Sequence, residues 1–180
     1  MSCTDLLAYW RSKHANGVPP SRADLDPVSE IPKLVRGLML VDCATEGYRF
    51  RLIGSDLVSR AGGDGTGRLV KSAPYPTAVL DRWIEFMDRA VQTREPQLTR
   101  SYLKGGGTIL TLILPLVSAN GSTEMLLGGA FPESATEGVW QPETIERLDI
   151  ALLAGEASGS DRAPAREGIA GPNLTIRFQT

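Results

Sequence analysis

The chain has 180 residues, of which 42% are hydrophobic and 22% are charged, and its formal net charge is −2. Such values are typical of a globular protein, and a chain of this length can bury a core without disulfides or metals. Lysine and arginine are scattered, with no basic stripe interleaved with aromatic residues and no polybasic block. We therefore expect neither a nucleic-acid partner nor a membrane contact.

The sequence also allows a prediction of the cellular location of the protein. The N-terminus lacks the basic region and long apolar run of a signal peptide. The longest apolar stretch, Ile109 to Val117, is too short to span a bilayer and contains Pro115. We therefore expect a cytoplasmic protein, in which Cys3 and Cys43 stay reduced and serve in packing.

The first third of the chain predicts two helices followed by a β-hairpin. The expected elements are a helix over residues 4–15, a short helix over 27–35, and strands over 38–43 and 48–53. On the second strand Tyr48, Phe50 and Leu52 alternate with two arginines, which predicts one buried face and one solvent-exposed face.

The middle of the chain combines a glycine-rich loop with the clearest helix. A short helix is expected over residues 54–61, followed by Gly62 to Gly67, where four of six residues are glycine. Residues 77–93 predict an amphipathic helix. Its apolar stripe consists of Leu80, Trp83, Ile84, Met87 and Val91.

The last third predicts a meander and another helix. Strands are expected over 97–103, 108–117 and 123–131, with tight turns that make them antiparallel neighbours, and a helix over 140–153. The chain then divides into four parts by residue number. These are an N-terminal helical extension over 1–36, a core over 37–133, a C-terminal helix within 134–155, and a tail over 156–180 that we expect to be mobile.

The order of elements is compatible with several α+β folds, and short motifs narrow the choice. The chain resembles a family of short, stand-alone bacterial PAS proteins over about residues 4 to 133. The resembling residues are Tyr9-Trp10, Pro20-Ser21-Arg22-Ala23-Asp24, Asp26-Pro27, Phe50-Arg51-Leu52-Ile53-Gly54, Gly63-Asp64-Gly65-Thr66-Gly67-Arg68 and Leu114-Pro115-Leu116. The resemblance implies a PAS fold, a five-stranded antiparallel sheet with helices on one face and here with flanking terminal helices, and a sensory or interaction role. It implies no particular ligand.

The composition disfavours catalysis and most cofactors. His14 is the only histidine, so a Ser-His-Asp or Cys-His site lacks its base, and no cysteine and histidine cluster has zinc spacing. Residues 75–95 contain no axial histidine for haem, and Cys43 lacks the motif of flavin-binding PAS domains. The glycine loop has P-loop spacing, but Arg68-Leu69 replaces the required Lys-Ser/Thr. We expect no catalytic residue, no metal and no cofactor, and interpret the loop as a turn.

In a PAS fold the apolar stripe of the long helix borders a ligand pocket. The candidate pocket residues are Phe50, Leu52, Trp83, Met87, Tyr102, Leu112, Met125 and Leu127. The sequence leaves open whether this space is filled core or an open pocket for an unknown small molecule.

Three functions follow from these alternatives. The first is a stand-alone PAS regulator that senses a small molecule or relays a signal to another signalling protein in trans, as a homodimer through the helices at 4–15 and 140–153. The second is a ligand-free interaction adaptor with a solid core. The third is an enzyme with an unrecognised site, for which the strand faces offer no converging polar groups.

Overall fold

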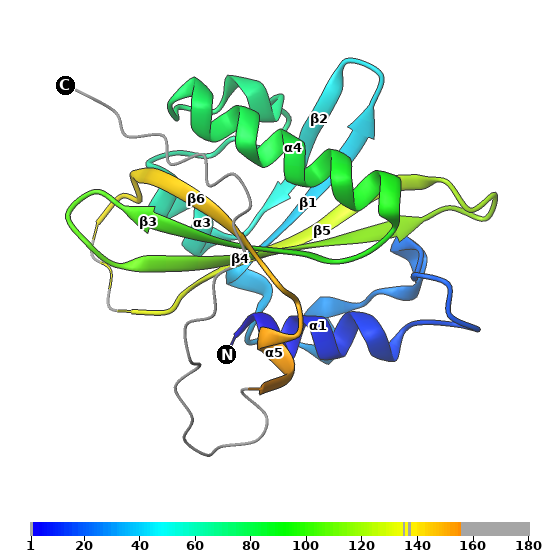
Figure 1. The fold of residues 1–180 in the computed structure, drawn as a ribbon. Helices are drawn as coiled ribbons and strands as arrows, with labels where there is room; N and C mark the ends of the chain where they lie inside the picture. Colours follow the sequence, from blue (N-terminus) through cyan, green and yellow to red (C-terminus); the bar gives the residue numbers. More distant parts are fainter. Residues whose placement is uncertain (1, 135, 137, 156–180) are drawn as a thin grey trace, which may run out of the picture.

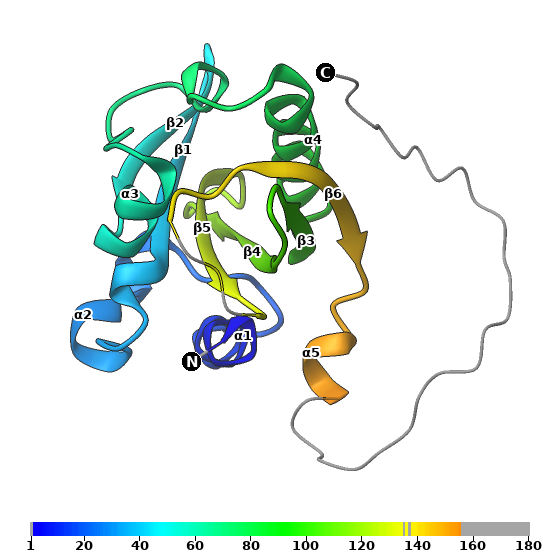
Figure 2. The ribbon, with the colours of Figure 1, turned by 90° about the vertical axis from the view of Figure 1, so that its left-hand side faces the viewer.

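The computed structural model describes residues 2–134, 136 and 138–155. Helix α4 lies across one face of an antiparallel sheet, and helices α1 and α5 lie on the opposite face (Figures 1 and 2). The helices are α1 (Cys3–Ser12), α2 (Pro27–Glu30), α3 (Ser55–Ala61), α4 (Thr77–Thr93) and α5 (Leu152–Gly155). The strands are β1 (Leu38–Ala44), β2 (Gly47–Ile53), β3 (Gln97–Leu103), β4 (Thr108–Val117), β5 (Thr123–Pro132) and β6 (Pro142–Leu148).

The sheet has six strands in the order β2-β1-β5-β4-β3-β6, and every neighbouring pair is antiparallel. The five strands expected from the sequence are confirmed to within one residue at each end. The α+β class is also confirmed, with one strand more than the five expected, and α1, the expected N-terminal flanking helix, covers the side opposite α4. The short helix expected over 27–35 is divided into α2 and a 3-10 turn at Val35–Gly37.

The helix expected over residues 140–153 is wrong, because residues 142–148 form strand β6 along the edge of β3. Ile145 and Leu148 are spaced as on one helix face, but as strand residues they pack on opposite sides of the sheet. Pairing with β3 satisfies backbone groups that a helix would have left unpaired at that edge. The helix on which part of the homodimer contact was expected is therefore not formed over residues 142–148, and the homodimer itself stays a prediction. The four-part division of the chain also stays a prediction, and its tail at 156–180 lies outside the described residues.

Strand β4 is buried on both of its faces. Its even-numbered leucines pack with the buried residues Leu6, Leu7 and Trp10 of α1. The indole Nε1 of Trp10 donates a hydrogen bond to the carbonyl oxygen of Pro115 at 3.0 Å. Helix α1 is thus part of the main core, and its apolar face is occupied by its own sheet.

A β-bulge interrupts the pairing of β1 with β2 between Leu40 and Val41. Leu40 pairs with Leu52, and Val41 pairs with Phe50, so one residue of β2 is left without a direct partner. A bulge changes which face the following residues occupy. Beyond it Ile53 shares the face of Phe50, whereas Leu52 lies on the other face and is 48% exposed.

We predict that Leu112→Ala lowers the free energy of unfolding by about 2–5 kcal/mol, because Leu112 is fully buried and its removal leaves a cavity between β4 and α1. Leu52→Ala serves as the control, with an expected loss of roughly 0.5 kcal/mol at an exposed position. Urea denaturation of both variants measures the difference. Equal losses would contradict this assignment of the two residues.

Candidate functional site

A cavity of about 350 Å³ lies between the α4 side of the sheet and the segments that cover it. Its size lies within the range of small-molecule pockets. The lining comes from β1 to β5, α3, α4, the loop after α3 and the segment that begins β6. The lining residues are Met39, Phe50, Ile53, Leu57, Ala61, Gly62, Gly63, Asp64, Gly65, Arg68, Leu69, Ser72, Ala73, Pro74, Tyr75, Trp83, Met87, Ser101, Ile109, Thr111, Ile113, Ala130, Trp140 and Pro142.

Three of the eight candidate pocket residues line this cavity: Phe50 on β2, and Trp83 and Met87 on α4. Whether they bind a ligand stays a prediction. The other five were expected in the pocket but do not line it. They are Leu52, Tyr102, Leu112, Met125 and Leu127.

The five misplaced residues lie on the opposite side of the sheet. Leu112 and Leu127 belong to the core that α1 covers, and Met125 packs against that core. Tyr102 pairs with Thr108 and is 40% exposed. On β3 and β4 the residues that replace them on the cavity side are one position away along the strand. Examples are Ser101, next to Tyr102, and Thr111, next to Leu112.

Trp140 is a cavity residue that the sequence analysis assigned to a helix. It precedes β6, is only 9% exposed and packs with Leu57 of α3 and Ile109 of β4. Its backbone N–H donates to the carbonyl oxygen of Arg60 at 2.7 Å, and its indole Nε1 donates to the Thr136 hydroxyl at 3.2 Å. The segment before β6 therefore closes one side of the cavity through an anchored aromatic ring.

The glycine-rich loop lines another side of the cavity and is fixed to the edge of β2. The backbone N–H of Phe50 donates to the carbonyl oxygen of Arg68 at 3.0 Å, and that of Gly67 donates to the carbonyl oxygen of Phe50 at 2.7 Å. Asp64 accepts a hydrogen bond from the backbone N–H of Thr66 at 2.8 Å. Hydrogen bonds from Thr66 hold the pKa of the Asp64 carboxyl below its usual value. The loop is thus a turn docked on the sheet, as interpreted from the sequence.

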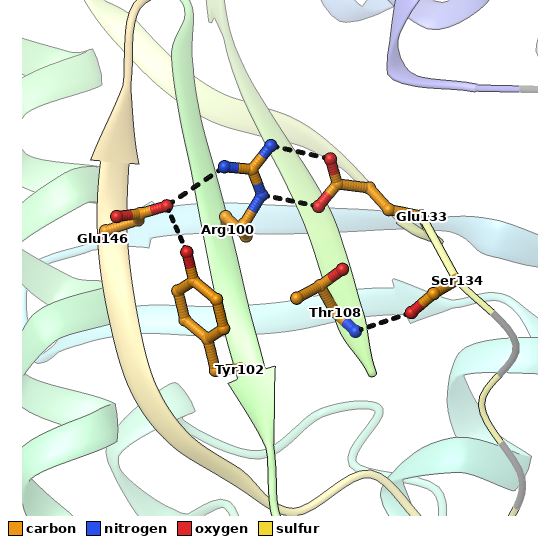
Figure 3. Close-up of polar contacts among 6 residues, drawn as sticks. All are labelled: Arg100, Tyr102, Thr108, Glu133, Ser134 and Glu146. Carbon is orange, nitrogen blue, oxygen red and sulfur yellow. Dashed lines mark hydrogen bonds and ion pairs between the residues drawn. The ribbon is translucent and has the colours of Figure 1, made fainter. Parts of the chain in front are cut away.

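Outside the cavity, Arg100 joins β3 to both ends of the segment that carries Trp140 (Figure 3). Its Nε and Nη2 bind the two carboxylate oxygens of Glu133 at 2.6 and 2.8 Å, and its Nη1 binds Oε1 of Glu146 at 3.1 Å. The Tyr102 hydroxyl donates to the same Oε1 at 2.8 Å. We call Arg100, Tyr102, Glu133 and Glu146 the arginine clamp. Bidentate charge-assisted contacts of this kind fix the relative orientation of the paired side chains, so the clamp holds β6 in position beside β3.

Cys43 and His14 lie apart from the cavity. Burial raises the pKa of the Cys43 thiol to about 11, which keeps it protonated. The His14 ring lies edge-on to Trp10 with 4.1 Å between ring centroids. Across residues 2–134, 136 and 138–155, no group of three or more His, Cys, Asp or Glu side chains is arranged to hold a metal ion. In the same part of the chain, no helix combines the length and the apolar character that crossing a membrane requires.

We predict that Arg100→Gln loosens β6, because it removes the cation that both carboxylates share. Amide hydrogen exchange of residues 143–148 should accelerate about fivefold, which corresponds to about 1 kcal/mol of local opening free energy. Arg147→Gln, an exposed position on the same strand, is the matched control. Unchanged exchange in Arg100→Gln would refute the role of the clamp.

The clamp also predicts an acid-sensitive contribution to stability. The hydrogen bond from Arg100 holds the pKa of the Glu133 carboxyl below its usual value. A lowered folded-state pKa gives stability that is present above the unfolded-state pKa and is lost as pH falls through the folded-state value. Between about pH 6 and about pH 3, the urea midpoint of the wild type should therefore fall further than that of Arg100→Gln. Parallel pH profiles of the two proteins would exclude this contribution.

Comparison with solved structures finds likenesses at low identity. The chain is similar to VqmA bound to DPO, with 14% identity, a TM-score of 0.48, and coverage of 61% of this chain and 57% of that chain. It is also similar to a sensory box sensor histidine kinase from Vibrio cholerae, with 14% identity, a TM-score of 0.45, and coverage of 60% of this chain and 90% of that chain. A fungal LOV domain photoreceptor matches with 18% identity, a TM-score of 0.40, and coverage of 73% of this chain and 92% of that chain. No curated protein matches this chain.

The family assignment rests on a different comparison. A family model described as a PAS domain matches residues 1–130, which extend from α1 into β5. The matched residues include Tyr9-Trp10 and all five motifs downstream of it in full, and the antiparallel sheet has the strands that the resemblance implied. Because the match covers more than half of its length, the chain belongs to the PAS domain family.

Proposed function

We propose that this protein is a PAS sensory domain that binds a small molecule in the cavity between the sheet, α3 and α4. In this proposal it catalyses no reaction and passes its signal to another protein in trans. The open cavity of about 350 Å³ is the observation that supports it. A ligand-free adaptor with a solid core would have no such space, and well-packed interiors rarely leave voids larger than a water molecule.

In this proposal, residues that line the cavity pass a ligand-induced conformational change from the cavity to the protein surface. Trp83 and Met87 are part of α4, and Trp140 is covalently continuous with β6. A ligand that contacts these side chains binds best to one arrangement of α4 and β6, and so shifts the protein toward that arrangement. Because β6 is an edge strand held by the arginine clamp, we propose that it carries the change to a partner protein or to a second copy of this chain.

We predict that at least one compound in a metabolite thermal-shift screen raises the melting temperature by about 5 °C near saturation, since a ligand at 100 times its dissociation constant adds about 2.7 kcal/mol. Native mass spectrometry should show the matching added mass. Ala130→Leu, which fills the cavity, should abolish both effects, and Ala8→Leu on the exposed face of α1 should retain them.

A different outcome would favour the adaptor. If no compound shifts the melting temperature and native mass spectrometry shows only the mass of the bare chain, the ligand-binding proposal is wrong. Retention of the shift in Ala130→Leu would place the binding site elsewhere.

A further inference from the structure

We propose that the cavity takes a neutral aromatic molecule that carries one hydrogen-bonding group, and that the hydroxyls of Ser101 and Thr111 receive this group. The inference rests on the proposed function, because it names the class of ligand for the same cavity. Three features of the lining support it: where charge lies, which walls are aromatic, and which polar groups line the cavity.

Charge is confined to the mouth of the cavity. The charged lining residues are Asp64 and Arg68, and both lie on the exposed glycine-rich loop. The Asp64 carboxylate already accepts a hydrogen bond from the Thr66 backbone, and the Arg68 cation lies close enough to act on it. The walls formed by the sheet, α3 and α4 contribute no charged side chain. A charged ligand buried there would lose its hydration without gaining an opposite charge, so the interior selects a neutral molecule.

Aromatic rings enclose the interior from four separate segments. Phe50 comes from β2, Tyr75 from the loop before α4, Trp83 from α4 and Trp140 from the segment before β6. The rings of Tyr75 and Trp83 meet edge to face, with centroids 5.2 Å apart and planes at 72°. Aromatic side chains favour offset or edge-on packing against another ring.

Two methionines complete the ring-lined walls, Met39 from β1 and Met87 from α4. A thioether makes favourable contacts with aromatic ring edges and adapts to their shape. The anchored Trp140 ring limits how far the walls can move to follow a flexible chain. Together these walls favour a flat ring system over an aliphatic chain.

The sheet wall supplies two buried hydroxyl groups. Ser101 and Thr111 are 2% and 6% exposed, and both line the cavity. Thr111 pairs with Thr99, two residues before Ser101, so Ser101 and Thr111 are diagonal neighbours on the same face.

Polar groups for a ligand come from this pair and from the helix that faces it. The Thr99 hydroxyl donates to the carbonyl oxygen of Thr111 at 3.4 Å, which leaves the Thr111 hydroxyl itself on the cavity wall. Across the described residues, the buried side-chain atoms without a hydrogen-bond partner are His14 Nε2, Trp83 Nε1 and Thr123 Oγ1, and of these three residues Trp83 lines the cavity. A buried N–H without a partner is unfavourable. Since a hydroxyl can both donate and accept, an O–H, N–H or carbonyl group on the ligand can hydrogen-bond to Ser101 and Thr111.

The test compares three probes that share one ring system: 1-naphthol, naphthalene and 1-naphthoate, which is anionic at neutral pH. Binding is measured by calorimetry on the full chain and on Ser101→Ala, Thr111→Val and the double variant. We expect the wild type to bind 1-naphthol about tenfold more tightly than naphthalene, and 1-naphthoate most weakly. In the double variant the preference for 1-naphthol should fall below about twofold, with naphthalene affinity retained. Thr108→Val, on the same strand but outside the cavity, should behave as the wild type.

Each other outcome separates the inference from the proposed function. If naphthalene binds as well as 1-naphthol, or the double variant keeps the preference, the hydroxyl pair does not recognise the ligand, although the cavity still binds. If 1-naphthoate binds most tightly, the ligand class is anionic and the inference is wrong. If none of the three probes binds while the metabolite screen still finds a ligand whose binding Ala130→Leu abolishes, the inference is wrong and the proposed function stands; if the screen also finds none, both are wrong. Should the double variant not fold, the two single variants carry the comparison, with an expected loss of preference in each.

Discussion

The burial of β4 on both faces is the constraint on which the rest of the structure depends. One face packs against α1, and the other forms part of the wall opposite α4. A strand with two apolar faces must be covered on each side, because apolar surface exposed to water is unfavourable. Helix α1 provides one cover. On the other side the cover is incomplete, and the cavity occupies the space that α4, α3 and the neighbouring loops leave.

This division also separates two roles within one sheet. The side under α1 is filled by leucine side chains, with Trp10 hydrogen-bonded to the backbone of Pro115. The cavity side mixes aromatic rings, small residues and hydroxyls. Rigidity on the filled side holds the strands in register, so that side chains on the cavity side keep their positions without filling the space themselves. A packed core thus supports an unpacked site across a single layer of strands.

The sequence predicted the elements better than it predicted the faces of the strands. Helix α4 has one apolar stripe, so the inward direction of Trp83 and Met87 could be inferred from spacing. Strand β4 has no polar alternation, so nothing in its sequence says which residues face α4. Leu112 was accordingly assigned to the wrong side. On β2 the alternation was visible, but the bulge reversed it after Phe50 and turned Leu52 away.

The error at residues 140–153 has a different cause. Ile145 and Leu148 are three residues apart, which fits a helix, but two apolar residues in so short a segment cannot distinguish a helix from an edge strand. The unpaired edge of β3 decided the outcome, and that edge exists only in the folded protein. Trp140 became a cavity residue through the same long-range pairing. No local signal would have placed it there.

The position of β6 determines which truncated fragments keep the cavity wall and the sheet edge intact. A fragment that stopped at residue 130, where the family match stops, would lack Trp140 and Pro142 from the cavity wall. It would also lose both carboxylates of the arginine clamp and leave the backbone of β3 unpaired along its outer edge. Such an edge is a template for association between chains. We therefore expect a truncation at the family boundary to leave an open sheet edge that favours association between chains, and a fragment that keeps the cavity wall intact to extend to at least residue 148.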